Sequence, residues 1–272
     1  MMGPSLVDSE DLCIAVARAK EGDRQALEQL VRALQDDVYR LALRMTAHPD
    51  DARDATQEVL VKVITRLDGF RGESTIRTWA YRIAVRHVLD RKKSRVESLA
   101  LDFERFGADL LDGLAAEPDG DPLLAEEVKR GCTLAMLTCL DREHRLAYIL
   151  GDVFGLTAGE AAGFCAVAEA AYRQRLSRAR RALEAFTESF CGLVNGRAPC
   201  ICSRRVARAE ELGRLQREQP QLARAVVEHA QAEMESLHAT ARLMRGHPAY
   251  AAPDRLLDGV RALVARGPFV LQ

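Results

Sequence analysis

The sequence lacks the features that mark membrane and secreted proteins. No apolar run approaches the roughly 18 residues that a membrane-spanning helix requires. Residues 1–10 contain neither the basic start nor the apolar stretch of a signal peptide. We therefore expect a chain that works in the cytoplasm without membrane contact. Strand-like alternation is absent and β-branched residues are sparse beside Ala, Leu, Arg and Glu, which favours an all-α fold. No internal repeat is evident.

Motifs that would indicate an enzyme are also missing. The chain has no phosphate-binding glycine loop, no metalloprotease helix and no nucleophile motif. Thiol chemistry at Cys200 and Cys202 is the one enzymatic alternative that the residues offer. We expect a protein that is not an enzyme.

The formal net charge is only −1, but the charges are segregated along the chain. Residues 71–95 carry a net charge of +6, residues 97–127 a net charge of −9, and residues 168–186 a net charge of +3. Two basic stretches separated by an acidic connector indicate two anion-binding faces. Ordinary solvated helix faces are the alternative interpretation of the same pattern.

Helical periodicity divides the chain into three helical regions. In residues 23–46, apolar residues recur every three or four positions, as in an amphipathic helix. Pro49 suits the first turn of the next helix, and Ser74 or Thr75 can cap a third helix over about 76–94. Residues 97–122 are rich in Gly, Pro and acids and look like a linker. We predict domains at 8–96 and 123–187 and a C-terminal extension at 188–272.

The second region has the pattern of a helix-turn-helix. Residues 157–160 (Thr-Ala-Gly-Glu) form a capping-box sequence, and a turn near Ala166 precedes a long basic helix from Glu169. Such a unit places its second helix in the major groove of DNA.

Two stretches, in this order, resemble the bacterial extracytoplasmic-function sigma factors of RNA polymerase. Residues 50–59 (DDARDATQEV), 70–73 (FRGE) and 78–86 (TWAYRIAVR) resemble region two of that family. Residues 156–162 (LTAGEAA) and 173–180 (RQRLSRAR) resemble region four. The resemblance covers roughly 8–187. It implies a sigma factor that binds core RNA polymerase and directs promoter recognition and melting, with core polymerase and promoter DNA as partners.

The resemblance also implies roles for individual residues. The polymerase clamp would be bound by Asp51, Asp54, Gln57 and Glu58. The minus-ten element would be bound by Gly72, Glu73, Ser74, Thr75, Arg77, Arg82, Arg86 and Lys92, with a flipped base held at the loop. The minus-thirty-five element would be read by Arg173, Gln174, Arg175 and Arg178, since Arg and Gln suit guanine and adenine edges. The alternatives are a solvated acidic face and a plain helix cap at the loop. Trp79 is expected in the core rather than as a wedge that stacks on bases.

The second region departs from the family pattern at several positions. Ala168 stands where the recognition helix usually has a Ser cap, and Ala166 stands where the turn usually has Gly. Ala171 replaces a usual Thr, and Glu169 puts negative charge near the DNA. Readout of the minus-thirty-five element is therefore less well supported than readout of the minus-ten element.

The C-terminal extension carries three closely spaced cysteines of the seven in the chain, Cys191, Cys200 and Cys202. Three thiolates and an imidazole from His229, His238 or His247 would make a tetrahedral zinc site. A redox-active thiol pair and structural cysteines are the alternatives, and the spacing matches no usual zinc pattern. Cys132 and Cys139, seven residues apart, are expected to be buried small hydrophobes on one helix face.

Many two-domain members of this family depend on a separate anti-sigma protein, so our hypothesis is that the extension regulates the sigma factor in cis. A conventional helix-turn-helix regulator is the competing function, but it would leave residues 50–95 without a purpose.

Overall fold

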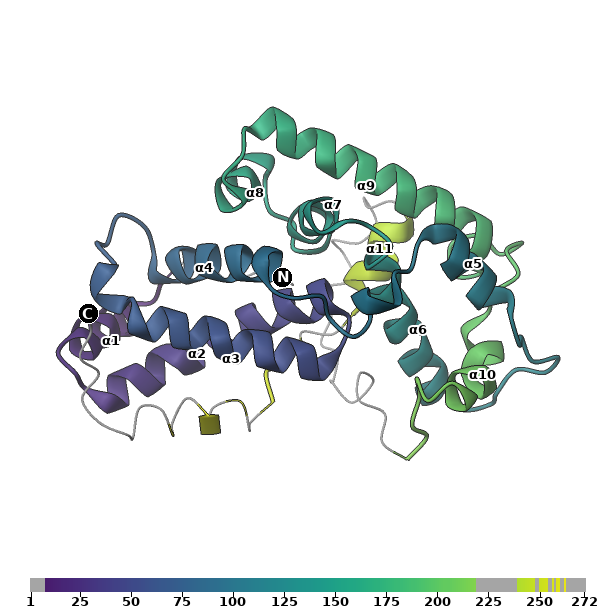
Figure 1. Ribbon diagram of the computed structural model, residues 1–272, viewed down its shortest axis with the longest axis horizontal. Helices are drawn as coiled ribbons and strands as arrows, with labels where there is room; N and C mark the ends of the chain where they lie inside the picture. The colour runs from purple at the N-terminus through teal and green to yellow at the C-terminus, as the bar shows by residue number, and fades with distance from the viewer. Residues whose placement is uncertain are drawn as a thin grey trace.

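The structure, a computed structural model, describes residues 8–218, 239–247, 250–253, 256, 258–259 and 262. Within these ranges the chain is helical (Figure 1), as the sequence predicts. The elements are α1 (Glu10–Lys20), α2 (Arg24–Thr46), α3 (Pro49–Thr65), η1 (Leu67–Gly69), α4 (Ile76–Asp90), η2 (Glu97–Leu99), α5 (Phe103–Leu111), α6 (Pro122–Leu137), α7 (Arg142–Tyr148), η3 (Ile149–Val153), α8 (Ala158–Cys165), α9 (Glu169–Phe190), η4 (Cys202–Arg205), α10 (Val206–Glu211) and α11 (Ala239–Arg245).

The first domain is a bundle in which α2, α3 and α4 pack against one another, with α1 on α2. The Asp23 carboxylate caps α2 by accepting the backbone N–H groups of Gln25 and Ala26. Pro49 occupies the first turn of α3, as its fixed φ and missing N–H favour. Thr75, rather than Ser74, caps α4 by accepting the N–H of Thr78.

Helix α4 ends at Asp90, four residues before the predicted end. Arg91 is extended, with ψ of 161°. The chain then turns so that the Ser94 hydroxyl donates to the Thr46 carbonyl oxygen at 2.8 Å. The residues after Asp90 therefore leave the helix to contact the end of α2.

The stretch 97–122 is more ordered than the linker that its composition indicates. It contains η2 and α5, and Phe103 and Phe106 of α5 pack against Phe186 of α9 with ring centroids 5.3 and 5.5 Å apart. Phe103, Phe106 and Leu110 recur every three or four residues, so burial of one apolar face stabilises the helix despite the surrounding Gly and Pro.

The second domain is built from α6 to α9. Thr157 and Glu160 form the predicted capping box at the start of α8. The turn to α9 places Ala166 in the left-handed region, with φ of 54°, where the absence of a glycine costs on the order of 1 kcal/mol. Ala168 makes no side-chain cap at the start of α9.

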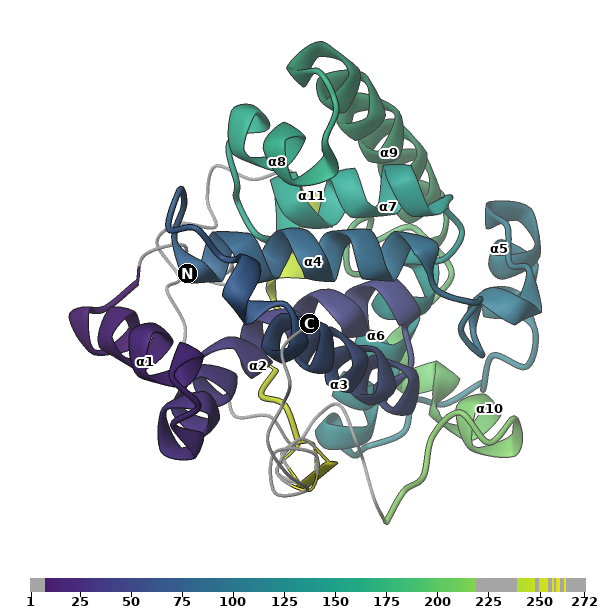
Figure 2. The ribbon, with the colours of Figure 1, turned by 60° about the vertical axis from the view of Figure 1, so that its left-hand side comes forward.

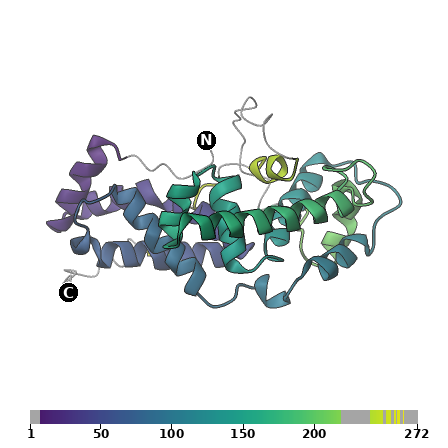
Figure 3. The same ribbon diagram turned by 90° about the horizontal axis from the view of Figure 1, so that it is seen from above.

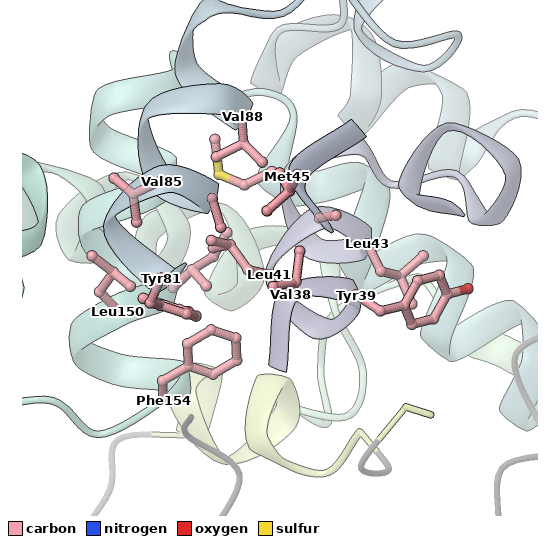
Figure 4. Packing of buried hydrophobic residues seen from close by; sticks show 14 of the residues in the cluster. Val38, Tyr39, Leu41, Leu43, Met45, Tyr81, Val85, Val88, Leu150 and Phe154 are labelled. Atoms are coloured by element: carbon pink, nitrogen blue, oxygen red, sulfur yellow. The ribbon is translucent and has the colours of Figure 1, made fainter. Parts of the chain in front are cut away.

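The two domains share one hydrophobic core. Helix α8 contacts α4, and α7 contacts α2 (Figures 2 and 3). Figure 4 shows Tyr81 and Val85 of α4 beside Leu150 and Phe154 of the second domain. The Tyr81 ring meets the Phe164 ring of α8 edge-on, with centroids 5.1 Å apart. The domains are therefore closed on each other in this structure.

The described part of the extension contributes α10 and α11. Helix α10 packs beside α6, and α11 packs on α9 and η3. The predicted zinc ligands His229 and His238 lie outside the described residues.

No helix in the described ranges combines the length and the apolar character that crossing a membrane requires.

Candidate nucleic-acid interface

A basic groove runs between α3 and α4. It is an open hollow of about 360 Å³. Its lining consists of Lys62, Arg66, Trp79, Arg82, Ile83, Arg86, His87 and Asp90. Four cationic side chains against one carboxylate make this groove a site for an anionic, extended ligand such as a nucleic acid strand.

Helical spacing explains why the cations gather there. Arg82 and Arg86 are four residues apart on α4 and share one helix face. Lys62 lies in the last turn of α3, and Arg66 is the residue that caps the end of α3. Packing of α3 against α4 brings the two pairs to the same groove. The resemblance predicted Arg82 and Arg86 as DNA contacts, whereas Lys62 and Arg66 were missed. The i, i+4 spacing of Lys62 and Arg66 is the signal that could have found them.

His87 positions one of these cations. Its Nδ1 atom lies 2.7 Å from Lys62 Nζ. Burial, and then the positive charge of Lys62, lower the pKa of His87. The imidazole is therefore neutral near pH 7 and accepts a hydrogen bond from the Lys62 ammonium, which holds that charge at the floor of the groove.

Trp79 belongs to the core and to the groove at once. Its ring packs on Phe70 with centroids 5.6 Å apart, and it also lines the hollow. The core position that the sequence favours is therefore present, and the half-buried side chain also lines the groove.

The other residues assigned to the minus-ten element fall into two groups. Gly72, Glu73 and Lys92 are exposed, and Gly72 has φ of 75°, which a glycine adopts freely. Arg77 instead faces α2, where its Nη1 atom donates to the Ala33 carbonyl oxygen at 2.8 Å and pairs with Asp37 at 3.1 Å. In this structure Arg77 holds α4 against α2 and is not directed to solvent.

Helix α9 presents Arg173, Gln174 and Arg178 to solvent. Arg175 is turned toward α7, where it pairs with Glu143 at 2.8 Å. Arg180 donates to Asp152 at 2.7 Å from its Nε atom. Arg175 and Arg180 are therefore held by acidic residues of the second domain, although Arg180 is still 44% exposed.

The acidic residues predicted to bind the polymerase also differ in exposure. Asp54 and Glu58 are exposed on α3, and Gln57 is half-buried. Asp51 is only 8% exposed, and its carboxylate accepts the Arg95 backbone N–H at 2.7 Å. Asp51 therefore stabilises the chain after α4 in this structure.

A buried ionic cluster of Glu97, Arg142 and Arg145 joins the two domains. Glu97 accepts two hydrogen bonds from Arg142, both 2.9 Å, and one from Arg145 at 2.8 Å. Burial alone would raise the pKa of Glu97, but these arginines and the Ser94 N–H lower it to about 2. Arg142 also donates to the Leu89 carbonyl oxygen at 2.8 Å. The cluster ties α7 of the second domain to the end of α4.

Comparison with known proteins defines the class of the chain. A model of Sigma-70 region 2 matches residues 30–97, and a model of Sigma-70 region 4 matches residues 130–183. The chain is 30% identical to the ECF RNA polymerase sigma-E factor of Escherichia coli over 179 residues, which is 63% of this chain and 91% of the relative. It is also 30% identical to the ECF sigma factor SigE of Mycolicibacterium smegmatis over 169 residues, which is 60% of this chain but only 63% of that protein.

The chain therefore belongs to the ECF sigma factors of RNA polymerase, with regions 2 and 4 followed by a C-terminal extension. Sigma factors bind core RNA polymerase and promoter DNA, direct transcription initiation and are not enzymes. A solved structure of CnrH with the cytosolic domain of CnrY is similar at a TM-score of 0.47 and 23% identity, over 66% of this chain and 98% of that one. From here the first domain is called region 2 and the second region 4.

Proposed function

We propose that this ECF sigma factor is regulated in cis by its C-terminal extension, which holds regions 2 and 4 closed on each other. The observation that carries the proposal is a three-way junction at Arg44. This α2 side chain is 1% exposed, and its guanidinium lies 5.3 Å from the ring of Phe154 in region 4 and 5.3 Å from the ring of Tyr250 in the extension. One buried cation therefore contacts all three parts of the chain.

The junction depends on the extension for its stability. Burial lowers the pKa of Arg44 to about 10. In the described residues the Nη2 atom of Arg44 has no hydrogen-bond partner, so the two aromatic faces supply attraction that a salt bridge would otherwise give. The Tyr250 hydroxyl lies 2.7 Å from His247 Nδ1, and His247 Nε2 hydrogen-bonds to Thr133 of α6. Loss of Tyr250 would leave the buried charge poorly compensated.

Other contacts of the extension reach both regions. The Thr240 hydroxyl lies 2.7 Å from the Thr187 hydroxyl of α9, and Arg245 donates to the Asp152 carbonyl oxygen. On the region 2 side, the Ala252 N–H donates to the Asp36 carboxylate at 2.8 Å. The segment from α11 to Ala252 therefore bridges region 4 to region 2.

The closed arrangement is incompatible with simultaneous contact at both promoter elements. The minus-ten and minus-thirty-five elements are about 25 base pairs apart, which is on the order of 85 Å of B-DNA. Helix α4 of region 2 contacts α8 of the region 4 helix-turn-helix directly. The two regions must therefore separate before α4 and α9 can engage one promoter, and every contact that holds them together opposes initiation.

The extension also approaches the predicted polymerase-binding face. A Cβ atom added at Gly259 would lie 2.1 Å from Gln57 Nε2, so the extension backbone abuts this side chain on α3. Leu256, which is 1% exposed, belongs to the shared core nearby. The extension therefore covers part of the α3 face at Gln57, whereas Asp54 and Glu58 stay exposed beside it.

In the open state, exposed residues carry out the three binding functions. Asp54, Gln57 and Glu58 bind the polymerase clamp, the basic groove with Gly72 and Glu73 binds the minus-ten element, and Arg173, Gln174 and Arg178 read the minus-thirty-five element. Such a protein acts in the cytoplasm with core polymerase. The closed state is held by the chain itself, so a separate anti-sigma protein is not required for it.

We expect Tyr250→Ala to tighten binding of core polymerase by about tenfold. The apparent affinity of a protein scales with the fraction in its binding-competent state, and this variant raises the open fraction. Fluorescence titration of the labelled chain with core polymerase measures the effect. Asp36→Ala, which removes the carboxylate that accepts the Ala252 N–H, should shift the affinity in the same direction with less disturbance of the core.

Leu193→Ala is the matched control, because Leu193 lies in the extension and is exposed. Its affinity should equal that of the unaltered chain. Unchanged or weaker binding by both Tyr250→Ala and Asp36→Ala would refute regulation in cis.

A further inference from the structure

Four of the seven cysteines meet where region 4 joins the extension. They are Cys132 of α6, Cys191 at the end of α9, and Cys200 and Cys202, which precede and begin η4. Cys132 is distant from the other three along the chain, and its sequence context alone predicts a buried small hydrophobe. All four are free thiols.

The backbone holds Cys191 and Cys200 side by side. They form an isolated parallel bridge, in which the Gly192 N–H donates to the Cys200 carbonyl oxygen at 2.9 Å and the Cys200 N–H donates to the Phe190 carbonyl oxygen at 3.1 Å. A Cβ atom at position 192 would lie 2.8 Å from the Cys200 carbonyl oxygen, so only glycine permits this approach. Bridge partners lie about 4.8 Å apart, within reach of one shared ligand.

Packing of η4 against α6 brings the other two cysteines to the same place. The Asp119 N–H donates to the Ser203 carbonyl oxygen at 2.9 Å, and the Ala115 N–H donates to the Arg204 carbonyl oxygen at 3.0 Å. These bonds fix η4 beside the chain that leads into α6. Cys202 therefore lies against the helix that carries Cys132.

The thiols influence one another electrostatically. Burial, and then negative charge on Cys202, Cys200 and Cys191, raise the pKa of Cys132 well above its usual value. The same two causes raise the pKa of Cys202 to about 12. Such thiols are protonated near pH 7 and are poor nucleophiles, which disfavours a redox sensor. A bound cation has the opposite effect on protonation, because the thiols that ligate it lose their protons and bind as thiolates.

Positive side chains are present to offset the charge of such a site. Arg205, which is 4% exposed, stabilises the thiolates of Cys132 and Cys200, and Lys129 stabilises that of Cys202. A divalent cation with four thiolates carries a net charge of about −2. Arg205 and Lys129 compensate this charge from outside the ligand set.

We propose that Cys132, Cys191, Cys200 and Cys202 together bind one thiophilic cation of the zinc class, which fastens the start of the extension to region 4. The part of the chain that the structure describes contains no ready-made group of three or more His, Cys, Asp or Glu side chains around a metal position. Each cysteine thiol can rotate about its Cα–Cβ bond, and metal binding requires these rotations to bring the four sulfurs around one cation. His247, a predicted ligand, is instead hydrogen-bonded to Thr133 and Tyr250.

Titration of the reduced, metal-free full chain with Co²⁺ tests the proposal, since Co²⁺ reports tetrahedral thiolate ligation by its absorption. We expect one Co²⁺ per chain, with intense sulfur-to-metal charge-transfer bands, and displacement of Co²⁺ by Zn²⁺. Changing a residue outside the ligand set typically costs 10- to 100-fold in metal affinity. Cys132→Ser, which removes a ligand, should therefore weaken Zn²⁺ binding by more than about 100-fold.

Cys139→Ser is the matched control. Cys139 lies just beyond α6, and burial likewise raises its pKa to about 12, but none of the four thiols is among the groups that shift it. Its substitution should leave the metal affinity unchanged. The proposal is overturned if the chain takes up no Co²⁺ or Zn²⁺, if Cys132→Ser binds as the unaltered chain does, or if Cys139→Ser loses as much affinity. The titration uses neither polymerase nor DNA, so its failure leaves regulation in cis untouched.

Discussion

Replacing Arg82 and Arg86 together by alanine should lower promoter-dependent run-off transcription by core polymerase at least about 30-fold. Each arginine that contacts a base or phosphate contributes about 1–3 kcal/mol, and about 1.4 kcal/mol corresponds to a factor of ten. Both side chains are exposed and line the basic groove between α3 and α4. The dependence of initiation on salt should also become shallower by about two units of slope, one for each lost contact.

Arg105→Ala is the control, because it removes a positive charge that does not line the groove. Arg105 is exposed on α5, away from the groove, and its side chain is 68% exposed in an ion pair with Asp102. Transcription by this variant should match that of the unaltered chain. If the double variant transcribed normally at every salt concentration, the basic groove could not be the minus-ten site. The single variants Arg86→Ala and Lys92→Ala should show smaller losses in the same direction.

Replacing Arg145 by alanine should lower the free energy of unfolding by about 3–5 kcal/mol, the usual cost of removing one partner from a buried ion pair. Arg145 is 2% exposed, and it donates to Glu97 and to the carbonyl oxygens of Leu137 and Leu140, both at 2.9 Å. It also donates to the Met45 carbonyl oxygen of α2. Equilibrium urea denaturation followed by circular dichroism measures the loss.

The Glu97 cluster adds a signature in the pH dependence of stability. Because the pKa of Glu97 is lowered from 4.5 to about 2, its contribution is present above pH 4.5 and is lost as the pH falls toward 2. Glu97→Gln should lack this part of the acid destabilisation. Arg173→Ala, which removes an exposed pair with Glu169, should change stability by less than about 1 kcal/mol. An equal loss in Arg145→Ala and Arg173→Ala would contradict the buried cluster.

Local signals in the sequence predict the helices well. The start of α3 at Pro49, the capping box at Thr157 and the helix from Arg24 to Thr46 all follow from residues within a few positions of one another. The Gly and Pro content of residues 97–122 indicates irregular structure, whereas Phe103, Phe106 and Leu110 recur at helical spacing. That spacing forms α5 only because α9 supplies Phe186 as a partner.

Features that depend on packing between distant segments could not be predicted. The resemblance assigns Arg77 to the minus-ten element, but Asp37, forty residues earlier, pairs with it. Cys132 joins the other cysteines only through the packing of α6 on η4. The burial of Arg44 between Phe154 and Tyr250 likewise needs region 2, region 4 and the extension to be in place together.

Regions 2 and 4 contact each other in this structure, and regulation in cis requires that they separate at the promoter. Paired fluorescent labels on non-natural residues at Lys93 and Ser177, both exposed, report the distance between the end of α4 and α9. We expect high energy transfer in the free chain and loss of transfer in the complex with core polymerase and promoter, where the two elements are on the order of 85 Å apart. Persistent high transfer in a complex that synthesises RNA would contradict the account.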